Sequence, residues 1–81
     1  MLNLEVSTRL SQEDVIQRLR KFFGKEGLGL DIIEEAPQCV SFGGGGGHVT
    51  ATLCSEEGKI RITLLTQEWE NQVKKFASSL P

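Results

Sequence analysis

The sequence predicts an α+β domain with the element order strand, helix, four strands, helix. Apolar and polar residues alternate with a period of two in several short segments, and they repeat with a period near 3.6 in two longer ones. Short links rich in turn residues join the consecutive strands. Because each strand has one apolar face and each helix one apolar stripe, we expect a single antiparallel sheet of about five strands with both helices packed on one face.

The chain opens with a strand and then a helix. Residues 1–6 alternate apolar and polar side chains, as in a strand with one buried face. Ser11 predicts the helix start, because its hydroxyl can accept a hydrogen bond from the amide of Asp14. Gly24 or Gly27 ends the helix, and Gly27 is better placed as a left-handed cap. The apolar stripe of this helix consists of Val15, Ile16, Leu19, Phe22 and Phe23.

Four strands follow, separated by turn signals. We predict them over residues 28–32, 39–42, 48–54 and 59–65. Residues 34–38 are expected to form a turn, because Pro37 cannot donate a ladder hydrogen bond. Residues 55–58 are polar and end in glycine, which is typical of a tight hairpin connection.

A second helix closes the chain, and its apolar stripe completes the predicted core. We expect Thr66 to cap this helix. The predicted core consists of Leu4, Val6, Val15, Leu19, Phe22, Phe23, Leu30, Ile32, Val49, Ala51, Leu53, Ile60, Ile62, Leu64, Trp69, Val73 and Phe76. The open face of the sheet is expected to carry Asn3, Glu5, Ser7, Thr50, Thr52, Arg61 and Thr63.

This order of elements resembles the single repeat of the TATA-binding-protein-like fold and a shortened helix-grip domain of the Bet v 1 and START type. The likeness is greatest over residues 58–81, where the strand Lys59-Ile60-Arg61-Ile62-Thr63-Leu64 runs into a helix with Trp69 and Phe76 inward. Helix-grip domains have more strands and a second short helix. A large lipid cavity of the helix-grip kind is therefore not expected here.

Length and charge exclude several classes of protein. A chain of 81 residues with 38% hydrophobic and 25% charged residues predicts one globular domain over residues 1–81. The net charge of -2 and the lack of a basic block disfavour nucleic-acid binding. No apolar stretch approaches the roughly 20 residues of a spanning helix, and no signal peptide pattern opens the chain. We therefore expect a cytoplasmic protein with no membrane association.

Five consecutive glycines, Gly43, Gly44, Gly45, Gly46 and Gly47, lie between two predicted strands. Glycine-rich phosphate loops open a helix, whereas this run opens a strand and is followed by no Lys-Ser or Lys-Thr. Three alternatives stay open. The run is a flexible hairpin tip, a set of strand glycines that lets the sheet bend, or a mobile flap that orders on a ligand or partner.

His48 and Trp69 are the other candidate site residues. One imidazole does not make a metal site, and Cys39 and Cys54 lack ligand spacing and are expected to be reduced thiols. Trp69 fits the core stripe of the last helix, or it roofs a pocket between that helix and the glycine-bearing hairpin. No metal or cofactor is expected.

Catalytic patterns are not found in the sequence. The neighbouring acids at 34–35 and at 56–57 point to opposite faces of their strands, and no serine lies in a Gly-x-Ser-x-Gly elbow. We therefore expect a noncatalytic binding module for a small apolar ligand or a protein partner. The alternative is a protein-interaction or oligomerisation module that uses the open sheet face or an edge strand.

Overall fold

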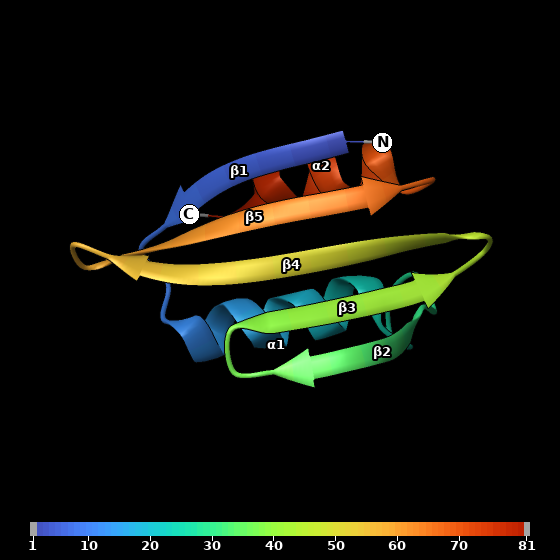
Figure 1. Ribbon diagram of the computed structural model, residues 1–81, viewed down its shortest axis with the longest axis horizontal. Coiled ribbons are helices and arrows are strands. Elements are labelled where there is room, and N and C mark those ends of the chain that lie inside the picture. Colours follow the sequence, from blue (N-terminus) through green and yellow to red (C-terminus); the bar gives the residue numbers. More distant parts are fainter. Residues whose placement is uncertain (1, 81) are drawn as a thin grey trace.

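The chain folds into one open, five-stranded antiparallel sheet with two helices behind one face (Figure 1). The computed structural model describes residues 2–80. The elements are β1 (Leu2–Thr8), α1 (Gln12–Phe23), β2 (Asp31–Ala36), β3 (Cys39–Gly44), β4 (Gly47–Glu56), β5 (Lys59–Gln67) and α2 (Glu70–Ser79). The predicted fold class is confirmed. Among the described residues, neither helix is long and apolar enough to cross a membrane.

The strands lie in the order β1-β5-β4-β3-β2, so the first strand pairs with the last. α1 carries the chain from β1 at one edge to β2 at the opposite edge, and the meander of β2 to β5 then returns (Figure 1). α2 lies behind β1 and β5, while α1 lies behind the other half of the sheet. The other face of the sheet is left open.

α1 begins at the predicted residue and ends at Gly24, one of its two predicted ends, but without the preferred cap. The hydroxyl of Ser11 accepts a hydrogen bond from the amide of Asp14 at 3.2 Å. The C-cap is Gly24 with φ −77°, so the prediction of Gly27 as a left-handed cap is wrong. The chain leaves the helix in an extended conformation and then folds back. The amide of Leu28 donates to the carbonyl of Phe22 at 3.0 Å and thereby satisfies one of the last helical carbonyls.

β2 lies further along the chain than predicted. It spans Asp31–Ala36, so residues 28–30 precede the strand, and the acidic residues at 34–35 belong to it rather than to a turn. A register shift between Ile32 and Glu34 marks a β-bulge. Ile32 is 46% exposed, which contradicts its predicted place in the core. An edge strand can solvate both faces, so two adjacent acids are tolerated there.

Thr66 belongs to the sheet and does not cap α2. β5 extends to Gln67, and the buried hydroxyl of Thr66 donates to the carbonyl of His48 on β4 at 2.8 Å. The N-cap position of α2 is occupied by Trp69, whose side chain forms no capping hydrogen bond. The prediction failed because pairing with β4 carries β5 past the expected end of the strand.

The core lies between the sheet and the helices, and a cluster of phenylalanines joins its parts. The ring of Phe23 lies 5.7 Å from that of Phe42 and 5.6 Å from that of Phe76, measured between centroids. Val40 and Phe42 are fully buried, although the predicted core did not include them. Four predicted core residues are only half-buried, and these are Leu4, Val6, Phe22 and Trp69.

Candidate functional site

The glycine run forms a regular hairpin in which only two residues lie outside the strands. Gly43 and Gly44 end β3, and Gly47 begins β4. Gly45 and Gly46 form the turn with φ of +60° and +83°. Two-residue hairpin loops with positive φ at both positions match the twist of the strands and favour glycine. The turn geometry therefore accounts for two of the five glycines.

Trp69 packs directly on this hairpin. Its ring nitrogen Nε1 donates to the carbonyl oxygen of Gly44 at 3.0 Å. A Cβ placed on Gly45 would lie 2.8 Å from Cζ2 of the Trp69 ring, closer than carbon atoms approach without a shift. The ring thus occupies the space between α2 and the hairpin where a pocket roofed by Trp69 would lie. The two candidate features are brought together, and they contact each other.

The remaining glycines also admit close neighbours. A Cβ on Gly43 would collide with the side chain of Ile33, and one on Gly47 would collide with the carbonyl of Gln67. A Cβ on Gly44 would lie 2.8 Å from Cδ2 of Leu30. Each of these partners comes from a segment distant in the sequence. Consequently, no local pattern reveals which neighbours these glycines meet.

His48 lies beside the hairpin on the open face of the sheet. In the ladder it is opposite Gly43 on β3 and Gln67 on β5. Within residues 2–80, no group of three His, Cys, Asp or Glu side chains could hold a metal ion. Cys39 is half-buried and Cys54 is exposed, and both are free thiols.

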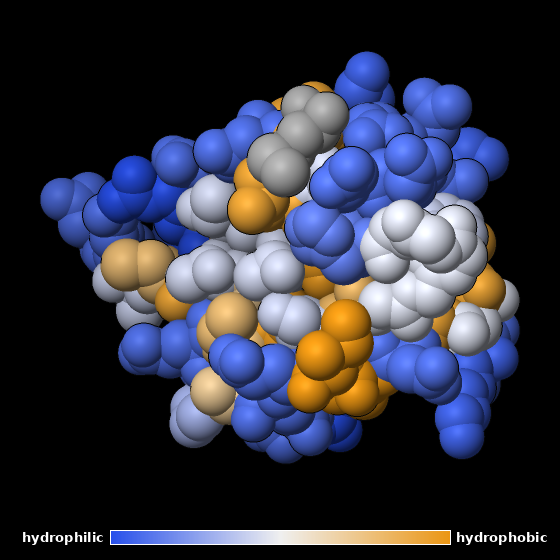
Figure 2. All heavy atoms as spheres, turned by 45° about the vertical axis from the view of Figure 1, so that its right-hand side comes forward, coloured by the Kyte–Doolittle hydropathy of each residue, from blue (hydrophilic) through white to orange (hydrophobic). Residues whose placement is uncertain are grey.

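The open face of the sheet is mainly polar. Ser41 and Thr50 lie opposite each other on β3 and β4, and their hydroxyl oxygens are 3.2 Å apart. Figure 2 views the molecule obliquely from the glycine-hairpin end, and there hydrophobic residues form small separate groups among pale and hydrophilic ones. In that view, the described residues offer no broad apolar area for a ligand or partner.

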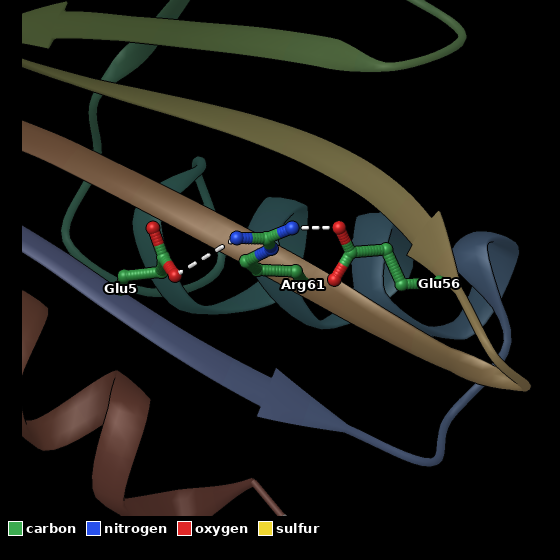
Figure 3. A network of polar contacts seen from close by, with 3 residues as sticks. All are labelled: Glu5, Glu56 and Arg61. Carbon is green, nitrogen blue, oxygen red and sulfur yellow. Dashed lines mark hydrogen bonds and ion pairs between the residues drawn. The ribbon is translucent and has the colours of Figure 1, made fainter.

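Arg61 connects three strands on the open face. It lies on β5, where its guanidinium contacts Glu5 on β1 at 3.3 Å and also pairs with Glu56 on β4 (Figure 3). The side chains are between 36% and 56% exposed, so each ion pair contributes at most about 1 kcal/mol. Arg61 therefore has two acidic partners, and its charge partly neutralises that of Glu5.

An apolar groove lies between the two helices, on the side of the molecule away from the open face. We call it the helix groove. It spans about 430 Å³, within the range of about 300–1,000 Å³ found for small-molecule sites. Its lining includes apolar residues from both helices and the loop after α1, two basic residues and a serine, namely Phe22, Leu28, Phe76, Arg18, Lys21 and Ser79.

The basic residues of the helix groove lie on the same side of α1 as its apolar floor. Arg18 is three residues from Lys21 and four from Phe22, the spacing that aligns side chains along a helix. Within residues 2–80, neither base forms an ion pair. Sequence reasoning missed this site because it assigned Phe22 to the core, whereas Phe22 is only half-buried. The half-burial of Phe22 depends on the loop after α1 and on α2.

A larger hollow of about 630 Å³ lies between α1 and β2. Charged residues of both signs line it, including Lys25, Glu26 and Asp31. Such a mixed lining does not select one class of ligand.

No protein-family model matches the chain, and no curated protein matches it.

Proposed function

We propose that this protein is a noncatalytic binding module that holds a small amphiphile in the helix groove, with the apolar tail on Phe22, Leu28 and Phe76 and an anionic head at Arg18 and Lys21. The observation that carries the proposal is the pairing of an apolar floor with two bases that have no acidic partner within the described chain. Cations beside an apolar surface favour ligands that bring both an apolar body and a negative charge.

The glycine hairpin is a weaker candidate for the ligand site. Trp69 contacts its backbone at Gly44 and Gly45, so a ligand would first have to displace the ring and break the hydrogen bond. The helix groove requires no such rearrangement, because Phe22 and Leu28 in its floor are already partly exposed.

The test is a titration with dodecanoate, followed by amide chemical shifts. We expect saturable shifts around residues 18–28 and 76–79, with little change at the glycine hairpin. Dodecyltrimethylammonium carries the same tail with the opposite charge and should bind more weakly. Absence of saturable dodecanoate binding, or shifts centred on the hairpin, would overturn the proposal.

Charge variants provide the matched control. The double change Arg18→Gln and Lys21→Gln removes both bases and should weaken dodecanoate binding by about tenfold, equivalent to about 1.4 kcal/mol. Lys59→Gln removes one positive charge at the start of β5, outside the groove lining, and should leave the affinity unchanged. If Lys59→Gln lost half as much binding free energy as the double variant, the attraction would depend on net charge alone, and the assigned site would be contradicted.

A further inference from the structure

The two edges of the sheet are unequally protected against pairing with another strand. At one edge, β1 pairs residue for residue with β5 over Leu2–Thr8. This strand contains no proline or lysine. At the other edge, β2 has a bulge at Ile33 and carries three acids within six residues, of which Glu35 pairs with Arg20 on α1. Bulges and charges usually protect edge strands against pairing with a further strand, so β2 is protected and β1 is not.

The single charge on β1 does not restore that protection. Glu5 lies on the open face, and its carboxylate contacts Arg61 at 3.3 Å. Arg61 draws the side chain toward β5, away from the outer edge (Figure 3). An approaching strand therefore meets a carboxylate that already has a cationic partner.

The other face of β1 is apolar and only partly covered. Leu2, Leu4 and Val6 alternate along the strand on the helix side, and all three remain half-buried against the core. On α2, which lies behind β1 and β5, Ala77 is also half-buried, as is Leu80 just after the helix. A further strand beside β1 would cover the exposed parts of this apolar row.

We propose that β1 pairs with β1 of a second copy of this chain, in antiparallel orientation about a two-fold axis at Leu4. Side chains directly opposite in a sheet share a face, so only registers that keep the faces matched join the two sheets. An axis at Leu4 sets Leu4 against Leu4 of the second copy and Leu2 against Val6 of the second copy. It also sets Asn3 against Glu5 of the second copy, an amide facing a carboxylate.

The neighbouring registers are less favourable. An axis at Glu5 would oppose two carboxylates directly, which destabilises cross-strand pairs. An axis at Val6 leaves Val6 against Val6 of the second copy as the one fully apolar pair. The axis at Leu4 gives three apolar pairs and no like charges, so the sequence of β1 is most self-complementary there.

The proposal is tested with charge changes at the axis. In analytical ultracentrifugation of the unmodified chain, the average mass should rise with concentration from that of one chain to that of two. Leu4→Lys and Leu4→Glu should each be monomeric, because either change places two like charges together. An equal mixture of the two variants should recover the dimer, since only an axis at residue 4 brings the lysine of one variant face to face with the glutamate of the other.

Two further variants keep the test independent of folding. Asn3 is exposed, so Asn3→Glu should leave the monomer folded while opposing Glu5 of the second copy twice, weakening the dimer roughly two- to thirtyfold. Asn3→Lys should strengthen it instead. Ile33→Lys on β2 is the control, because Ile33 is 66% exposed at the other edge, and it should leave the dimer unchanged.

Several results would overturn the proposal. These are a chain that stays monomeric at millimolar concentration, a dimer that survives Leu4→Lys, or a dimer that is lost with Ile33→Lys. Dodecanoate binding reports on the helix groove and not on β1, so failure here leaves the proposed function standing, and the reverse also holds.

Discussion

Gly45 is the turn glycine of the hairpin that combines a left-handed backbone with a close neighbour. Its φ of +60° lies in the left-handed region, and the Trp69 ring occupies the space into which a Cβ would project. Gly46 has a φ of +83°, but a Cβ there would meet nothing within 4 Å. Adding a Cβ at each of the two glycines therefore distinguishes the free-energy cost of the backbone conformation from the cost of contact with the Trp69 ring.

We expect Gly45→Ala to destabilise the protein more than Gly46→Ala. Both changes incur about 1–2 kcal/mol for a left-handed alanine, and only Gly45→Ala also forces the Trp69 ring to shift. Urea unfolding followed by tryptophan fluorescence measures both free energies. Equal losses would show that the ring yields to the added methyl group without cost.

At the scale of elements, the hairpin of β3 and β4 is attached to the start of α2 through Trp69. The indole contributes a hydrogen bond to the Gly44 carbonyl and a ring contact to Gly45. Among the three alternatives for the glycine run, these contacts favour strand glycines joined by a tight turn. The mobility of the tip stays a prediction until it is measured.

Replacing Trp69 with phenylalanine tests this attachment. Trp69→Phe keeps an aromatic ring but removes the Nε1–H donor, and we expect a loss of about 0.5–1.5 kcal/mol in unfolding free energy. Amide exchange should accelerate in residues 43–47 more than in the hairpin of β4 and β5. Uniform acceleration in both hairpins would contradict a local role for the indole.

The elements that sequence patterns located well are those with one buried and one exposed face. Residues 49–53 of β4 and 60–64 of β5 alternate apolar and polar side chains, and α1 has one apolar stripe, so their patterns report burial directly. β2 is exposed along nearly its whole length, so its residues carry no such alternation, and the predicted strand fell on the apolar residues before it. The helix groove was missed because it depends on how three separate segments meet.

At the scale of the whole molecule, local stability should follow position in the sheet. β4 and β5 pair along both sides, whereas β1 and β2 pair along one. In native-state hydrogen exchange, we expect the slowest amides in β4 and β5 and fast exchange in β2. Raising the protein concentration should slow exchange in β1 and leave β2 unchanged, and a change in both edges would contradict pairing through β1.

The inequality of the two sheet edges has a consequence for how far association can proceed. A strand that pairs with its own copy about a two-fold axis uses up the same edge on both molecules, and the closed interface leaves no bare edge for a third. The outward edges are then the two bulged, acidic β2 strands. Assembly therefore terminates at a pair, and the same features that admit one partner prevent growth into a fibre.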